Sequence, residues 1–362
     1  MRTFLTILFV CVTWNSCQRK PTSVPIQQFV RSDFGEQITL TNPTEIVMDS
    51  LLYPASFHLI RDTLMLVLNQ PSNSYLLEIY STNDWERPLL QLAPKGSGPG
   101  ELTSADVWIV RSGHPFFYVQ DRMADSYYKV HIDSLLSRKS FWATERFPLN
   151  SSCLPVADIC EMDEDTYCGY DMWYMEGEEY SNAVKTPLRL FSKSTTGNDA
   201  ENIPSYFTAS VNGARIFRLP DRHEIWTADL HKDEIIVYND SLQPIRKLTG
   251  PDGLQPSYRL LPSDAPMGFV DFEEGKSCRG YLSYWLAPSH IYLLYAGDEK
   301  YDMTHLKPVD VFKLDYEGHL LSLYHLDRHL INLSVDSEEH YLYGTARTSM
   351  QGESVLIRYD LP

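Results

Sequence analysis

The chain has 362 residues, of which 43% are hydrophobic, so it is long enough to bury a substantial core. Its 48 acidic residues outnumber its 31 Lys and Arg residues and give a formal net charge of −17. A surface with this charge repels phosphates, and no Lys/Arg cluster offsets it, so we expect no nucleic-acid partner.

The first 16 residues have the organisation of a bacterial signal peptide. Arg2 supplies a short positive region, and residues 4–12 form an apolar run that is too short to span a bilayer. A small residue directly precedes Cys17, which resembles the cleavage site of a lipoprotein whose cysteine is then acylated. Trp14 departs from the Leu that is usual there, and an ordinary signal peptide with an incidental cysteine is the alternative. Residues 18–20 lack the acidic residues of surface-exported lipoproteins, so we expect an outer-membrane anchor that faces the periplasm.

The segment after the predicted anchor, residues 17–44, contains three prolines among scattered polar residues. This composition predicts a tether that leads away from the membrane. A lone strand-like run follows at residues 45–49.

From residue 54 onward, short aromatic and β-branched runs alternate with turn-forming residues. They group into units of four strands, whose second strands begin near Leu64, Phe116, Tyr167, Glu224, Ile291 and His340. A period of about 50 to 65 residues with four strands per copy is typical of a β-propeller. The sequence therefore predicts an all-β fold over residues 45–362, a six-bladed β-propeller with four-stranded antiparallel blades. A pair of β-sandwich domains is the alternative, but it gives no reason for the number of copies.

The sixth unit ends one strand short. We expect residues 46–48 to pair with residues 354–359, so that an N-terminal strand closes the ring and removes an open sheet edge. The fourth strand of the third unit is not evident within residues 196–207. Two stretches, 171–184 and 251–280, interrupt the period, and loops of this length are often functional.

Four cysteines remain after Cys17: Cys153, Cys160, Cys168 and Cys278. A bridge among the first three is consistent with an oxidising periplasm, but four cysteines allow three full pairings and the sequence does not choose. Their spacing does not match a zinc ribbon.

One rim of the predicted ring collects the turns between second and third strands, together with the connections between blades. The expected ligand-binding residues on this rim are Asp121, Arg122, Asp171, Trp173, Asp229, His231, Arg279 and Arg347. Three of the aspartates recur at one position, just past the second strand. A repeated Asp at a turn is usually an Asx-type cap, and a ligand-binding carboxylate is the alternative.

The sequence contains no recognisable catalytic motif. It has no HExxH and no GxSxG, and the stretch KGSGPGEL (Lys95 to Leu102) lacks the Lys-Ser/Thr pair of a P-loop. We expect this stretch to form a turn between blades with positive φ, in which Glu101 bonds backbone N–H groups. We expect no metal and no cofactor.

The first functional hypothesis is a membrane-anchored, monomeric and non-enzymatic module that binds an envelope protein, peptide or glycan through the rim. The alternative is a periplasmic glycan or peptide hydrolase or lyase that draws its acid and base from Asp121, Asp171, Asp229 and His231. Such an enzyme would need two carboxyl groups converging from different blades.

Two segments carry a family resemblance. KGSGPGEL is similar to the Gly-rich blade connection of NHL-type propellers, and VFKLDYEG, LYHLD and INLSVDSEEHYLYG follow near the end of the chain. With the lipoprotein-like start, the chain resembles the TolB-like six-bladed propeller lipoproteins of the BF3164 group. This resemblance implies the fold and the location, and it implies no activity.

Overall fold

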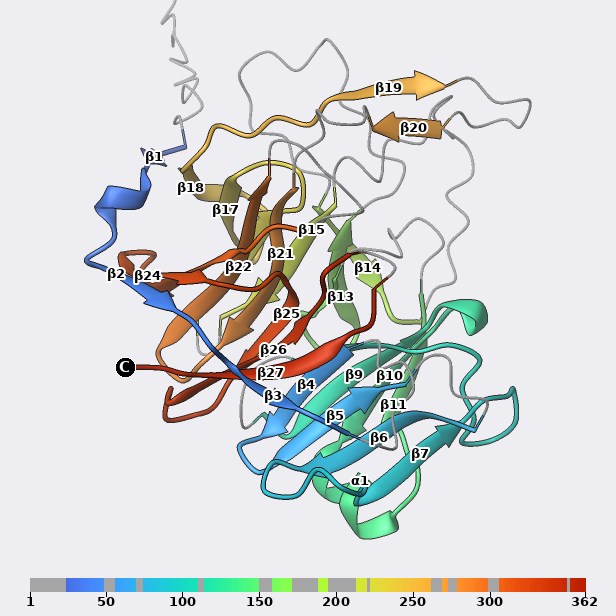
Figure 1. Cartoon of the computed structure of the whole chain (residues 1–362). Helices are drawn as coiled ribbons and strands as arrows, with labels where there is room; N and C mark the ends of the chain where they lie inside the picture. The colour runs from blue at the N-terminus through green and yellow to red at the C-terminus, as the bar shows by residue number, and fades with distance from the viewer. Residues whose placement is uncertain are drawn as a thin grey trace, which may run out of the picture.

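The structure is a computed structural model of the whole chain. It describes residues 24–48, 56–69, 74–109, 114–149, 158–170, 188–194, 213–219, 222–261, 269–272, 279–298, 306–349 and 352–362. Within these ranges the fold is all-β, with one α-helix, α1 (Ile132–Arg138). Six of the seven sheets that the strands form are arranged as the blades of a propeller, which confirms the predicted fold (Figure 1).

The first three blades follow the predicted units in chain order. Blade 1 contains β4 (Ser56–Arg61), β5 (Leu64–Leu68), β6 (Tyr75–Ser81) and β7 (Leu90–Pro94). Blade 2 contains β8 (Asp106–Ile109), β9 (Phe116–Asp121), β10 (Ser126–His131) and β11 (Glu145–Pro148). Blade 3 contains β12 (Cys160–Glu161), β13 (Thr166–Tyr170) and β14 (Leu188–Ser192) among the described residues, and the range expected to hold its fourth strand lies outside them.

Blades 4 and 5 each contain four consecutive strands, and blade 6 combines three consecutive strands with one from the front of the chain. Blade 4 contains β15 (Ala214–Arg218), β16 (Glu224–Asp229), β17 (Glu234–Asn239) and β18 (Pro244–Thr249). Blade 5 contains β21 (Arg279–Leu286), β22 (His290–Asp298), β23 (Asp310–Asp315) and β24 (Leu320–Leu326). Blade 6 contains β25 (Leu330–Val335), β26 (Tyr341–Ala346), β27 (Val355–Asp360) and β3 (Thr44–Ile46).

The ring is closed by β3, which comes from the front of the chain and pairs with β27 near its end. The partners are antiparallel, with Ile46 opposite Leu356 and Thr44 opposite Arg358. In Figure 1 the blue β3 runs beside the red β27. The predicted closure is confirmed, although the paired segment is Thr44–Ile46 rather than residues 46–48.

Part of the segment expected to be a tether forms strands instead. The strand β1 (Ile26–Gln28) pairs in parallel with β18, and β2 (Glu36–Leu40) pairs in parallel with β24. Each adds a fifth strand to the outer edge of a blade, because that edge offers unpaired N–H and C=O groups. Residues 26–40 of the predicted tether are therefore part of the propeller, and residues 1–23 lie outside the described range.

The core lies between blades, so the middle strands are buried on both faces. The strand β5 is a continuous apolar run in which Met65, Leu66 and Val67 are fully buried. This burial explains why the middle strands read as unbroken hydrophobic runs. Large aromatic side chains such as Trp226 and Tyr127 are also fully buried, in agreement with the expected role of most aromatics.

The connection from blade 1 to blade 2 has the predicted geometry. Gly100 has a φ of 79°, and the Gly98 N–H donates to Glu101 Oε2 at 2.8 Å. A Cβ on Gly96 would lie 2.0 Å from Glu101 Oε2, so a larger residue here would displace the Glu101 carboxylate from its hydrogen bond. The longer connection from blade 4 to blade 5 contains a separate hairpin, β19 (Tyr258–Leu261) with β20 (Phe269–Phe272).

Candidate functional site

A cavity of about 250 Å³ lies on the axis of the ring, where the innermost strands of all six blades contribute side chains. Its polar lining residues are Ser56, His58, Asp106, Asp158, Arg215, Ser283 and Asn332, one or two from each blade. The remaining wall is apolar and includes Leu282, Trp285 and Leu333. At ~30 Å³ per water, the cavity has room for about eight waters, or for one ligand group somewhat smaller than a drug-sized molecule.

The cavity lies toward the end of the ring where the innermost strands begin. Ser56 is the first residue of β4, Asp106 is the first of β8, and Arg215 is the second of β15. Each innermost strand begins where the chain arrives from the preceding blade. The cavity is therefore on the side of the blade connections, which is the side of the predicted rim.

An ion pair crosses the wall of this cavity. Arg215 Nη1 lies 3.1 Å from Asp158 Oδ1, and Asp158 is 2% exposed. Arg215 Nε donates to the Leu282 carbonyl at 2.7 Å, so this one side chain links blades 3, 4 and 5. A buried carboxylate that lost its cation would be strongly destabilising, so the pair fixes both the charge and the shape of this wall.

The imidazole of His58 lies on the opposite part of the wall, in blade 1. Its Nε2 is 3.0 Å from Ser56 Oγ, and burial lowers the pKa of His58 to about 4. The ring is therefore neutral at physiological pH, and it offers one donor and one acceptor rather than a charge.

Two further lining residues differ in how well their polar atoms are satisfied. Both polar atoms of the Asn332 amide have a partner, because Asn332 donates to the Phe57 carbonyl and accepts from the Thr345 N–H, both at 3.0 Å. Trp285 is buried, and its Nε1–H has no acceptor within the described residues. This nitrogen has almost no accessible surface, so Trp285 contributes its apolar ring to the cavity wall and not its N–H group.

The predicted rim residue Asp121 acts as a turn cap. Its carboxylate accepts hydrogen bonds from the backbone and hydroxyl groups of both Thr103 and Ser104, at 2.5–3.1 Å. Burial alone would raise the pKa of Asp121, but these hydrogen bonds outweigh it and lower the pKa below its ordinary value. Asp121 is 1% exposed, so its carboxylate holds the blade connection and does not face solvent.

Asp229 occupies the equivalent position in blade 4 and also caps its turn. Its Oδ1 accepts the N–H groups of His231 at 2.7 Å and Lys232 at 2.9 Å. Burial raises the pKa of Asp229 to about 7. The contacts of Asp229 are those of an Asx-type cap. Asp121 accepts one N–H within its own turn, from Ala124 at 3.3 Å, and its other bonds tie it to Thr103 and Ser104 of the blade connection.

The other predicted rim residues lie at strand ends on the same side. Gly280 N donates to Leu230 O at 2.8 Å, which places Arg279 beside the turn that holds Asp229 and His231. Arg347 follows β26, and its Nε donates to Ser354 Oγ at 2.7 Å. Arg122 begins the 3-10 helix η2 (Arg122–Ala124), and the predicted residues Asp171 and Trp173 lie outside the described residues, as does Cys17.

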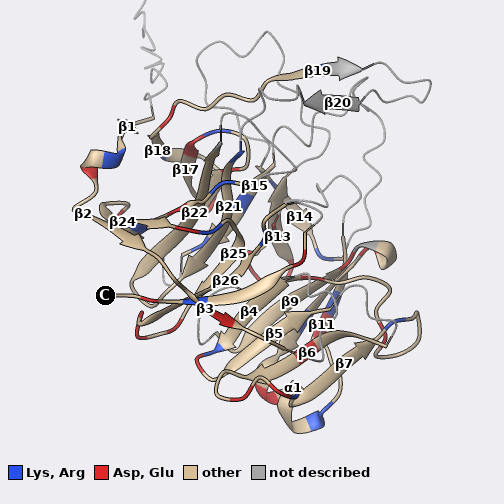
Figure 2. Cartoon of the chain, in the orientation of Figure 1, with Lys and Arg blue, Asp and Glu red and all other residues tan. Residues whose placement is uncertain are grey.

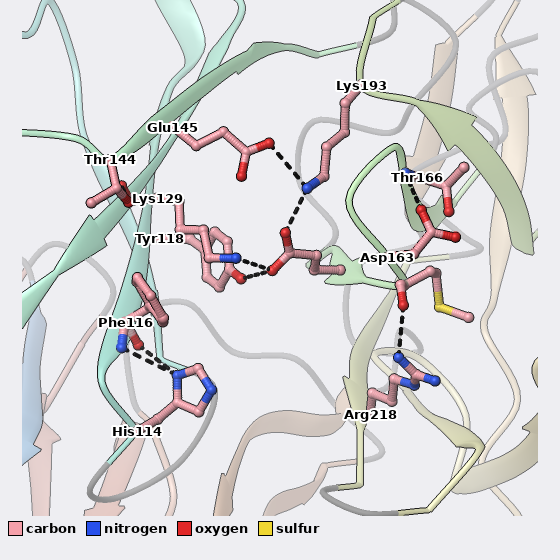
Figure 3. Close-up of polar contacts among 12 residues, drawn as sticks. His114, Phe116, Tyr118, Lys129, Thr144, Glu145, Asp163, Thr166, Lys193 and Arg218 are labelled. Carbon is pink, nitrogen blue, oxygen red and sulfur yellow. Dashed lines mark hydrogen bonds and ion pairs between the residues drawn. The ribbon is translucent and has the colours of Figure 1, made fainter.

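A second polar cluster lies between blades 2 and 3, on the side where the innermost strands end. Glu161 accepts from Lys129 at 2.6 Å, from Lys193 at 2.5 Å and from the Tyr118 hydroxyl. Lys193 also reaches Glu145 at 3.1 Å, and Figure 3 shows Lys193 between the two carboxylates. Burial would raise the pKa of Glu161, but the two ammonium groups and the Tyr118 hydroxyl lower it.

This cluster bears on the hydrolase hypothesis, because Glu145 and Glu161 converge from two blades. A glycosidase needs one carboxylic acid with a raised pKa. Here Lys193 bridges both carboxylates, and the pKa of Glu161 is lowered. The arrangement is therefore that of an ionic contact that holds two blades together.

Comparison with known proteins identifies the fold family. A family model described as TolB-like 6-blade propeller-like matches residues 33–338. The chain belongs to the TolB-like six-bladed propeller family. None of the curated proteins matches the sequence.

Solved structures resemble this TolB-like propeller at low sequence identity. A member of the DUF4221 family from Bacteroides vulgatus is 9% identical, with a TM-score of 0.51, over 88% of this chain and 97% of that chain. A putative exported protein from Bacteroides fragilis is 11% identical, with a TM-score of 0.44, over 90% and 99% of the two chains. At these identities the likeness to the first structure concerns the fold alone.

The described part of this TolB-like propeller contains no helix that is long and apolar enough to cross a membrane. Within the same residues, no group of three or more His, Cys, Asp and Glu side chains is arranged to hold a metal ion. Cys160 and Cys168 are directly opposite each other on β12 and β13, and both are buried. Cys153 and Cys278 lie outside the described residues.

Sequence reasoning missed the axial residues of the TolB-like propeller. Asp158, Arg215 and His58 stand one at a time in different blades, without a shared motif. The sequence feature that could have revealed them is a polar residue near the start of an innermost strand. At such a position, the alternation of apolar and polar residues along the strand predicts an apolar side chain. Only the closed ring brings these residues onto one cavity.

Proposed function

We propose that this TolB-like propeller is a non-enzymatic binding module of the bacterial envelope, held to the outer membrane through a lipid on Cys17 and facing the periplasm. Its partner is an envelope protein, peptide or glycan that covers the rim and places one polar group in the axial cavity. The lipoprotein-like start of the sequence supports the anchor. The axial cavity supports the binding role.

One observation carries this proposal. A cavity lined by all six blades combines the ion pair of the buried Asp158 with the half-buried Arg215, the neutral His58 and the hydroxyl of Ser56. Such a wall offers hydrogen-bond donors and acceptors beside apolar surface, which is the usual composition of a small-ligand site. Its volume suits one sugar ring or one amino-acid side chain rather than a whole chain.

The test is native mass spectrometry of the mature propeller after incubation with soluble envelope peptides and glycan fragments. We expect wild type to retain a bound mass that the double variant Asp158→Asn/Arg215→Met loses. The double variant removes both charges together, so it leaves no lone buried charge. Its matched control is Asp133→Asn/Arg61→Met, because this pair also links two blades but is exposed at 65% and 38%.

A propeller that captures nothing, or a cavity variant that captures the same mass as wild type, would overturn this assignment. If the bound mass is instead released as cleaved fragments, the hydrolase alternative replaces the binding module.

A further inference from the structure

The outermost strands of blade 4 form an edge that differs from the rest of the surface. The edge consists of β1, β18 and Val30, which follows β1. The charged residues of the two strands are Arg246 and Lys247, and neither strand contains a carboxylate. Acidic and basic residues are interspersed over the other blades of this acidic chain (Figure 2).

Three large apolar side chains are exposed on this edge. Ile26 is 60% exposed, Val30 is 51% and Ile245 is 40%. Ile26 is paired with Lys247, two residues along β18 from Ile245, so Ile26 and Ile245 lie on the same face of the sheet. Single exposed apolar residues are normal, but several on adjacent strands indicate a contact surface. Lys247 is paired with Glu234 at 2.7 Å, and Arg246 lies 3.9 Å from Glu224, so the exposed face of this edge is mainly apolar.

The chain length before β1 identifies what this edge contacts. The described chain begins at Val24, seven residues after Cys17. The start of β1, Ile26, is nine residues after Cys17, and nine extended residues span at most about 32 Å, so a lipid on Cys17 would hold the start of β1 within this distance of the bilayer. An edge with several exposed apolar side chains is also the kind of surface that inserts at a membrane interface.

We propose that the edge formed by β1, β18 and Val30 lies against the membrane surface. This inference rests on the lipid anchor of the proposed function. With one blade edge on the bilayer, the axis of the ring lies parallel to the membrane and the axial cavity opens sideways. Blade 1, on the opposite side of a six-bladed ring, is then farthest from the lipid.

The test uses the full-length acylated protein in vesicles of phosphatidylethanolamine and phosphatidylglycerol that carry a quencher on the lipid. A fluorescent amino acid replaces Gln27 on β1 in one sample and Leu89, beside the outermost strand of blade 1, in the other. Gln27 is exposed, and Leu89 is 54% exposed, so both positions tolerate the label. We expect quenching to be several-fold stronger at position 27.

Equal quenching at the two positions, or stronger quenching at position 89, would overturn the orientation while leaving the anchor in place. The variant Ile26→Ser/Val30→Ser/Ile245→Ser should stay on the vesicles but lose most of the difference in quenching between positions 27 and 89. If it keeps the whole difference, these apolar side chains do not make the contact. Failure of the protein to float with vesicles, with an unmodified Cys17 by mass spectrometry, would instead refute the anchor itself and the orientation that depends on it.

Discussion

Glu161 and Glu339 play the same part at two different blade junctions. Glu161 is the last residue of the innermost strand of blade 3, Glu339 lies in the turn after the innermost strand of blade 6, and each reaches back to a cross-strand Tyr–Lys pair of the preceding blade. Glu161 bonds Tyr118 and Lys129, and Glu339 bonds Tyr292 and Lys313. The two Tyr–Lys pairs are in register across the second and third strands of blades 2 and 5. The repeat architecture thus reuses one ionic contact to hold neighbouring blades together.

We predict that Glu161→Gln destabilises the propeller by about 2 to 3 kcal/mol, because it leaves Lys193 in a site where its side chain is only 5% exposed. The free energy of unfolding from urea titration at pH 7 checks this value. Glu164→Gln, an exposed neighbour, is the control and should change stability by less than ~0.5 kcal/mol. Equal stability of the two variants would show that the contacts of Glu161 do not stabilise the junction between blades 2 and 3.

Ring closure gives a second prediction. Replacing both Thr44 and Glu45 by proline removes two successive N–H groups, one of which must face β27, because strand N–H groups alternate in direction. We expect a loss of at least ~1 kcal/mol and faster hydrogen exchange in β27. The Thr44→Ala/Glu45→Ala variant keeps the backbone donors and should leave exchange in β27 nearly unchanged. Unaltered exchange in the proline variant would show that β3 does not close the ring.

The sequence predicted the ring and its closure because those features repeat. Six second strands recur at regular intervals, and a sixth unit that lacks a strand requires one from elsewhere. The strands β1 and β2 were missed because Ile26–Gln28 has no apolar alternation, and its residues are all exposed. The helix α1 was missed for a similar reason, since its seven residues bury only Ile132 and Leu135. Local patterns record burial, and these elements bury little.

The axial cavity could not be predicted, because its residues come from six separate strands. Asp121 and Asp229 show a related limit. The sequence places both aspartates just past a second strand, and both cap turns, yet their pKa values move in opposite directions. Burial raises the pKa of both carboxylates, and it dominates at Asp229, whereas the larger number of donors around Asp121 outweighs it there. Both factors depend on packing between blades.

Asp121 leads to a pH-dependent prediction. Asp121→Asn replaces an acceptor oxygen by an NH₂ group, so we expect a loss of about 2 kcal/mol at pH 7. Because the folded pKa of Asp121 is lowered, its stabilisation is present above about pH 4 and is lost as pH falls through the folded pKa. The difference between the free energies of unfolding of wild type and variant, measured by urea titration, should therefore become smaller below pH 4. Asp125→Asn, on an exposed turn residue, should show no such narrowing.

Asp229 should behave in the opposite way. Its folded pKa is raised to about 7, so the folded state binds the proton more tightly than the unfolded state, and stability falls as pH rises from about 4 to 7. Asp229→Asn keeps an oxygen for the His231 and Lys232 N–H groups and removes the ionisation. We expect this variant to match wild type near pH 4 and to exceed it by roughly 1 to 2 kcal/mol at pH 8, a discounted figure because Asp229 is only half-buried. Urea titrations at pH 4, 6 and 8 test this slope, and a variant less stable than wild type at pH 8 would show that the ionised carboxylate is the stabilising form.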